Sequence, residues 1–144
     1  MEKITFENLP STNTPLNATN LNLLQTNVEN AINGYVLYNN DTGSVGTITL
    51  SDSAANYDYI EIFYSKNRAY NSSTKIYKPN GKTASLITGY RSGSNFIQMQ
   101  IAIIEINGTS ITKTAPALIN FDNGVFSIFD TDEVSIHRVV GYKG

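Results

Sequence analysis

Apolar and polar residues alternate along most of the chain after residue 34, and this two-residue period is typical of β-strands. The longest run is Phe96–Ile106, in which one face is apolar and the other carries two amides. The apolar face consists of Ile97, Met99, Ile101 and Ile103, and the amides are Gln98 and Gln100. The pattern predicts strands at Tyr35–Tyr38, Val45–Leu50, Tyr57–Ser65, Thr74–Lys78, Ala84–Gly89, Phe96–Ile106, Thr109–Lys113, Ala117–Phe121, Val125–Phe129 and Val134–Val140.

Turn sequences separate these strands. Asn107-Gly108 and Asn123-Gly124 lie between apolar runs, and Asn-Gly is the strongest two-residue hairpin signal. Pro79-Asn80-Gly81 predicts a further turn, and residues 39–43 predict a loop. Many short strands with regular turns indicate a mainly β fold, which is an antiparallel β-sandwich or barrel-like domain over residues 35–144.

Residues 17–34 have a helical pattern instead. Asn17 can cap a helix over residues 17–33, and Gly34 follows as a stop. The apolar residues recur at steps of three and four, which is the spacing of a coiled-coil seam. This seam consists of Leu21, Leu24, Val28 and Ala31. Much of the remainder is Asn and Thr, which are poor helix formers, so the isolated helix would be marginally stable.

Two partners could cover the seam: the β-domain of the same chain, or the helices of sister chains. A helix that docks on its own domain usually shows a wider apolar face. The narrow seam and its position ahead of the β-domain therefore favour a trimeric bundle of helices. Residues 1–16 contain Pro10 and Pro15 and predict an extended arm, which would be ordered only where another component receives it.

The composition excludes several classes of function. Charged residues make up only 15% of the chain and the formal net charge is −2, so no basic surface for nucleic acid is expected. The absence of cysteine rules out disulfides, thiolate metal sites and cysteine nucleophiles. The first residues lack signal-peptide character, and no stretch is apolar enough to span a membrane. No cofactor is expected.

Candidate catalytic groups are few. His137 is the only histidine and no G-x-S-x-G elbow accompanies it, so a surface or interface role is favoured over catalysis. That role could include pH sensitivity. Glu61 and Glu105 could form a carboxylate pair for glycoside hydrolysis, but surface carboxylates on a sheet are the simpler interpretation.

An acidic cluster near the last strand is the one candidate for a metal site. Its carboxylates could bind calcium, which prefers oxygen ligands. The spacing lacks the EF-hand pattern, so a solvated acidic turn is favoured and no metal is predicted. The cluster consists of Asp130, Asp132 and Glu133, with Asp122 nearby.

Tyrosines near loops and strand ends indicate a binding surface. Tyrosine has an apolar ring and a polar tip, and neighbouring Asn and Arg side chains can form directional hydrogen bonds, a mixture that suits sugars. An alternative is that these tyrosines cover a sheet or an oligomer interface. The candidate ligand-binding residues are Arg68, Tyr70, Asn71, Tyr90, Arg91 and Asn95, with Tyr64, Lys66, Asn67 and Tyr77 beside them.

Two parts of the chain resemble bacteriophage structural proteins. The opening ITFENLPSTNTPLNATNLNLLQTNVENAING resembles an N-terminal segment in which a short arm leads into a helix. YDYIEIFYSKN, STKIYKPNGKT and VSIHRVVGYK are similar to a β-module at the C-termini of tail-fibre-like proteins. This resemblance to tail-fibre, baseplate and head-fibre proteins covers most of the chain. It implies a homotrimer around a threefold axis and no catalytic residue, although the longer shaft of a full fibre is not present here.

The sequence therefore predicts a non-enzymatic virion structural protein, made in a host bacterial cytoplasm. It would be a short trimeric fibre or a tail or baseplate subunit, attached to another virion protein through residues 1–16 and adsorbing to host surface polysaccharide. One alternative is a purely architectural head-fibre or decoration protein without a host ligand. A second is a carbohydrate-binding module of a bacterial protein, which would be monomeric, and a third is a small glycan-active enzyme.

Overall fold

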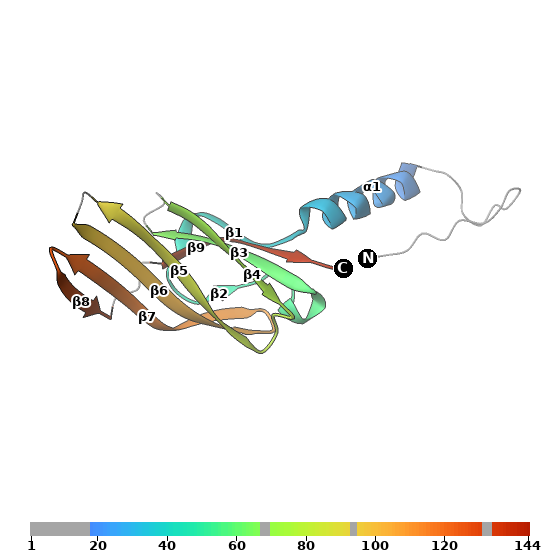
Figure 1. Ribbon diagram of the computed structural model, residues 1–144. Coiled ribbons are helices and arrows are strands. Elements are labelled where there is room, and N and C mark those ends of the chain that lie inside the picture. Colours follow the sequence, from blue (N-terminus) through green and yellow to red (C-terminus); the bar gives the residue numbers. More distant parts are fainter. Residues whose placement is uncertain (1–17, 67–69, 93–94, 131–133) are drawn as a thin grey trace, which may run out of the picture.

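The computed structural model describes residues 18–66, 70–92, 95–130 and 134–144. A single N-terminal helix in this part of the chain precedes two antiparallel sheets (Figure 1), which confirms the predicted mainly β fold. The elements are α1 (Ala18–Asn33), β1 (Tyr35–Ser44), β2 (Ile48–Thr49), the 3₁₀ turn η1 (Ala54–Asn56), β3 (Tyr59–Lys66), β4 (Tyr70–Tyr77), β5 (Lys82–Ser92), β6 (Phe96–Asn107), β7 (Ser110–Asp122), β8 (Val125–Phe129) and β9 (Val134–Tyr142).

The two sheets enclose one hydrophobic core. Sheet A has the strand order β1-β9-β3-β4, and sheet B has the order β2-β7-β6-β5. The short strands β2 and β8 pair with opposite ends of β7. Inward side chains of both sheets form the core, including Ile60 and Ile62 of β3 and Ile104 and Ile106 of β6, all of which are almost completely shielded from solvent. Burial of such side chains is the main stabilising contribution to the fold.

The turn predictions are confirmed. The hairpin predicted from Asn107-Gly108 forms, but Asn107 pairs with Ser110, so the residues that connect β6 to β7 are Gly108 and Thr109. Lys82 donates its backbone N–H to the Pro79 carbonyl, which closes the turn at residues 79–82. Asn123 and Gly124 connect β7 to β8 with φ values of 47° and 85°. A type I′ hairpin turn requires positive φ at both central residues, which explains this residue pair.

Two predictions in the region of β7 and β2 are wrong. Thr109–Lys113 and Ala117–Phe121 are parts of one strand, β7, which continues through Pro116. The register with β6 shifts at Thr114, and Pro116 lies between the segments that pair with β2 and β8. In the described structure, residues 112–117 of β7 have a neighbouring strand, β6, on one side only. The missing N–H of Pro116 is therefore tolerated. Of the strand predicted at Val45–Leu50, only Ile48–Thr49 forms β2.

The loop predicted at residues 39–43 is also wrong, because these residues belong to β1. The pairing of β1 with β9 jumps from Asn39↔Arg138 to Ser44↔Ile136, so the strand is bulged. Within the bulge, Asn40 Oδ1 accepts hydrogen bonds from the N–H and the hydroxyl of Thr42. The turn-forming residues were recognised, but they bend a strand instead of ending it.

A tight joint connects α1 to the sheets. Gly34 has a φ of +73°, and its N–H donates to the Asn30 carbonyl at 2.9 Å, which closes the last helical turn. A Cβ at this position would collide with Val140 and Tyr142, so glycine is required both for its conformation and for its lack of a side chain. Beyond this joint α1 projects away from the two sheets, on the side where β1 begins and β9 ends (Figure 1).

Candidate functional site

The predicted helix seam is exposed to solvent. None of the α1 residues is buried, and Leu21, Leu24 and Val28 expose 49%, 43% and 49% of their surface. Ala31 is exposed as well, and so is Ile32 at the base of the helix. The seam is therefore not covered by the β-sheets of its own chain, which was the alternative to association between copies.

The predicted ligand-binding residues come from two segments, residues 66–71 and 90–95, and the described strand ends of both lie at the end of the sheets opposite α1 (Figure 1). Lys66 pairs with Tyr70 at the end of the β3–β4 hairpin, and Ser92 pairs with Phe96 at the end of the β5–β6 hairpin. The β7–β8 hairpin closes at the same end (Figure 1). We call the described strand ends beside these turns, together with Asn123 and Gly124, the hairpin end. The structure thus places the two segments, which are separated in the sequence, at a common end.

Only part of the predicted ligand-binding set can be placed. Arg91 and Asn95 are exposed at the hairpin end. Asn95 Nδ2 donates to Asn123 Oδ1 at 3.1 Å, which connects the β5–β6 hairpin to the β7–β8 hairpin. The residues outside the described part of the chain are Asn67 and Arg68, together with the side chains of Tyr70, Asn71 and Tyr90.

A hollow of about 290 Å³ adjoins this amide pair. Asn95, Asn123 and Gly124 form its polar rim, and Ile97 and Phe121 form its apolar wall. Amide donors and acceptors beside an apolar surface are a combination that can hold a sugar ring. The sequence indicated Asn95 but missed Asn123 and Phe121, which were assigned only to a turn and a strand.

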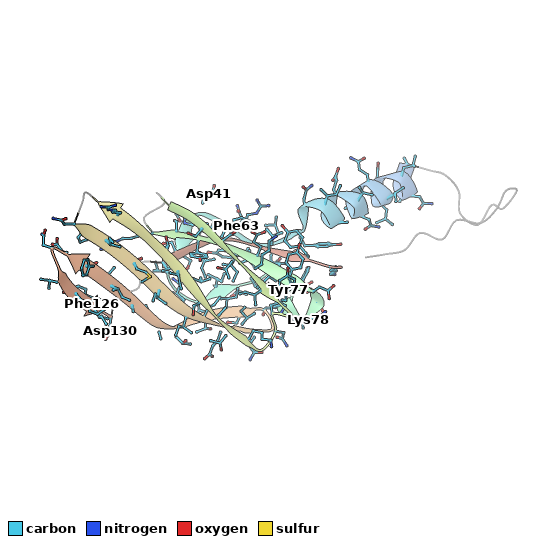
Figure 2. All side chains as sticks on the ribbon, viewed as in Figure 1. Asp41, Phe63, Tyr77, Lys78, Phe126 and Asp130 are labelled. Carbon is cyan, nitrogen blue, oxygen red and sulfur yellow. The ribbon has the colours of Figure 1, made fainter. Side chains whose placement is uncertain are left out.

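Two of the neighbouring tyrosines lie elsewhere. Tyr64 was expected near the binding surface, but it is only 4% exposed and belongs to the core. Tyr77 is 68% exposed, yet it lies near the α1 end, whereas Phe126 marks the opposite end (Figure 2). Lys66 is buried as well. Neither tyrosine therefore contributes to the hairpin end.

Tyr77 instead belongs to a row of three aromatic rings on the outside of sheet A. The centroids of Tyr59 and Tyr142 are 4.5 Å apart with ring planes at 10°, and those of Tyr59 and Tyr77 are 5.2 Å apart at 39°. The rings of Tyr59 and Tyr142 stack on each other across adjacent strands. The ring faces that these two tyrosines turn toward each other are covered by this stacking. This row contributes to sheet packing, and burial raises the pKa of the Tyr142 phenol.

Two carboxylates near the α1 end have structural partners. Asp52 accepts hydrogen bonds from the Ser53 N–H, the Asn56 amide and the Tyr57 hydroxyl at 2.7, 2.8 and 3.0 Å. These donors, the Ser53 N–H above all, lower the pKa of Asp52. Asp58 accepts from Lys78 and from the Gly144 N–H, and these contacts lower its pKa too. Both arrangements fix the loops around η1.

The candidate catalytic residues do not form a recognisable active site. Ser65 Oγ lies 2.7 Å from His137 Nε2, but Ser65 is completely buried, so a substrate has no access to its hydroxyl. Glu61 lies between the core residues Ile60 and Ile62 and faces outward from sheet A. Glu105 lies between core residues of β6 and faces outward from sheet B. The two carboxylates are thus on opposite sides of the core and cannot act on one bond.

The acidic cluster near the last strand, for which a solvated turn was favoured over a calcium site, lies partly within the described residues. Asp132 and Glu133 lie outside the described residues, and Asp122 and Asp130 are exposed. Within the described residues, no group of three or more metal-binding side chains comes together.

Comparisons with known proteins do not assign the chain to a family. No family model matches the chain, and no curated protein matches it either. Among the described residues, none of the helical structure has the length and apolar character needed to cross a membrane.

Proposed function

We propose that the chain is a non-enzymatic structural subunit of a bacteriophage particle, in which three copies associate through α1. The observation that carries this proposal is the exposed seam of Leu21, Leu24 and Val28 on a helix that projects from the sheets. The opening segment and the β-strands resemble tail-fibre, baseplate and head-fibre proteins, and this resemblance supports the assignment to a bacteriophage particle. The finer assignment of the two-sheet body as a β-sandwich belongs to the same proposal.

Association of the helices has a physical basis. A sixteen-residue helix rich in Asn is marginal alone, because each residue costs backbone entropy and few side chains are buried. Covering the seam in a bundle removes its leucines and valine from water and contributes about 1.5–3 kcal/mol for each fully buried side chain. The coiled-coil spacing allows three helices to do this at once.

The opposite end of the subunit is available for adhesion. With α1 and residues 1–16 directed toward the particle, the hairpin end points outward with Arg91, Asn95 and Asn123 exposed. We propose that this end contacts a polysaccharide on the host surface. Three weak sites on one trimer bind more tightly than one, because the second and third contacts form at a high effective concentration.

Two measurements test the proposal. Sedimentation equilibrium of the purified chain is expected to give the mass of three copies, and antibody labelling of intact particles is expected to find the chain on the virion. A monomer would overturn the assignment in favour of a carbohydrate-binding module. A glycan array then separates adhesion from architecture: binding that is lost in an Asn95→Ala variant supports an adhesin, whereas a virion-bound trimer that binds no glycan is an architectural protein.

A further inference from the structure

The outside of sheet B carries a continuous apolar surface. Residues directly opposite each other on antiparallel strands have side chains on the same face. Ile97 pairs with Phe121, and Phe121 pairs with Phe126; Met99 pairs with Ile119, and Ile119 pairs with Ile128. We call this surface the outer apolar face; it consists of Ile87, Ile97, Met99, Ile101, Ile119, Phe121, Phe126 and Ile128.

The polarity of β6 is reversed along this face. Gln98 and Gln100 point inward and are only 7% and 1% exposed, whereas Ile97 and Met99 point outward and are 50% and 38% exposed. A sheet that faces water on one side normally places its polar residues there. Gln98 also leaves its buried Oε1 without a hydrogen-bond partner in the described structure, which is unfavourable. This arrangement is expected where the outer side of sheet B is itself covered.

β8 also exposes apolar side chains to solvent. None of its five residues is buried, and Phe126 and Ile128 expose 60% and 58% of their surface. Exposed apolar side chains on an edge strand favour association with another chain, although the short length of β8 limits pairing through its backbone. In the described part of the chain, β8 and α1 are thus two elements that need a partner to bury their apolar residues.

The size and charge of the face are compatible with a contact between copies of the chain. Its exposed isoleucine, methionine and phenylalanine side chains present on the order of 500 Å² of apolar surface, which is at the upper limit for a monomeric protein. Three such faces packed about one axis remove on the order of 1,500 Å² from water, or on the order of 500 Å² for each pair of copies, so this contact adds to the α1 bundle and does not replace it. None of the eight apolar residues is charged. Arg91 pairs with Ile97 and lies on the same side at the β5 edge, so its charge can stay at the rim of a contact between copies.

We propose that the outer apolar face is a second contact between copies of this chain, in which the faces of three subunits pack about the axis of the α1 bundle. This inference rests on the proposed trimer and adds a contact between the β-domains to it. Burial of Phe126 and Ile128 against sister chains supplies the cover that β8 lacks. In that contact Ile97 and Phe121, the apolar wall of the hairpin-end hollow, are covered, so a ligand at this end would be held by the amide rim alone.

Thiol labelling tests this contact directly, because the chain contains no natural cysteine. Phe126→Cys places one thiol on the outer apolar face, and Tyr77→Cys places one on sheet A as a matched control. In a single copy the two positions are similarly exposed, at 60% and 68%. In the assembled protein the maleimide reaction at position 126 is expected to be at least tenfold slower than at position 77, and the rates are expected to become equal in denaturant.

The outcomes separate this inference from the proposed function. A wild-type monomer overturns both. A wild-type trimer in which the two thiols react equally fast overturns the sheet contact alone, and protection of position 126 only in whole particles assigns the face to another virion protein, which also overturns it. If Phe126→Cys remains folded by circular dichroism but no longer forms the trimer, while Tyr77→Cys does, the contact is supported; Ile128→Cys repeats the test at a second position.

Discussion

The hydroxyl of Tyr64 in sheet A binds both backbone groups of Ile87 in sheet B. It accepts a hydrogen bond from the Ile87 N–H at 3.2 Å and donates to the Ile87 carbonyl at 3.1 Å. Thr74 Oγ1 lies 3.0 Å from the same oxygen and can donate to its second lone pair. Because β5 is the edge strand of sheet B, these contacts satisfy edge groups that the sheet itself leaves open. One buried phenol therefore connects the two sheets.

Removal of that hydroxyl is expected to destabilise the protein. Tyr64→Phe keeps the ring in the core but leaves the Ile87 N–H and carbonyl without this partner, which should cost about 1–3 kcal/mol of the free energy of unfolding. Urea denaturation of the purified chain measures the loss. Tyr77→Phe removes an exposed hydroxyl and is expected to change the midpoint very little; equal effects of the two variants would contradict the bridging role.

The helix seam gives a second prediction, on assembly. Leu24→Asn introduces an amide into the centre of the seam and is expected to weaken or abolish the trimer while the sheets remain folded. Thr26→Asn changes an exposed position on the opposite side of α1 and should leave the mass unchanged. Sedimentation equilibrium compares the two variants at the same concentration, and circular dichroism checks the β-structure. A Leu24→Asn trimer as stable as the wild type would show that the seam does not hold the copies together.

A third prediction concerns the buried amide of Gln98. Its Nε2 donates to Asn120 Oδ1 at 2.8 Å, while its Oε1 has no partner among the described groups. Gln98→Met keeps the length of the side chain and removes this buried carbonyl, and Asn120 is partly exposed and can bind water instead. We expect the free energy of unfolding to rise by about 1 kcal/mol. A clear loss of stability in thermal or urea unfolding would mean that the amide is better satisfied than its contacts indicate.

Acid is expected to weaken the loops around η1. The pKa values of Asp52 and Asp58 are lowered in the folded protein from an ordinary value of 3.8. Their contribution to stability is therefore fully present above about pH 4 to 5 and is lost as the pH falls below 3.8 through the folded-state values. The urea midpoint should be nearly constant from pH 7 down to about pH 5, because pH 5 is still on the order of one pH unit above the range in which the two carboxylates become protonated. It should decrease at lower pH.

Asp52→Asn tests the origin of this pH dependence. It removes the titrating carboxylate, so it should lower the midpoint at pH 7 and make the acid dependence less steep. Glu105→Gln, at an exposed position on sheet B, is the control and should retain the wild-type profile. If Asp52→Asn and the wild type lose stability in parallel below pH 4, other carboxylates dominate the acid response.

Local sequence patterns predicted most of the secondary structure. The seam spacing and Gly34 predicted α1, and Asn-Gly pairs predicted two hairpins, because helix caps and tight turns depend on φ values that few residues adopt. The same local signals misled at two places. Pro116 and the turn-forming residues 39–43 lie inside strands, since a bulge and an unpaired edge accommodate them.

The candidate sites could be predicted less well, because they combine residues that are far apart in the sequence. Asn95 was recognised as a polar loop residue, but its amide partner Asn123 is 28 positions away and reaches it only because two hairpins close at the same end. The row of Tyr77, Tyr59 and Tyr142 was not foreseen, since the three rings come from different strands and meet only through the register of sheet A. Tyr64 was likewise predicted near the binding surface. Its burial depends on the packing of β3 against sheet B, where its hydroxyl contacts Ile87.

By itself the sequence determined where the helix, the turns and most strands lie, because those features arise from neighbouring residues. It also determined that β6 has an isoleucine and methionine face and a glutamine face. Only the tertiary structure decided which of these faces is inside, because that depends on where sheet A lies relative to sheet B, a contact between residues far apart in the chain. Gln98 and Gln100 are buried and Ile97 and Met99 point outward, so the strand pattern leaves an apolar surface exposed on sheet B.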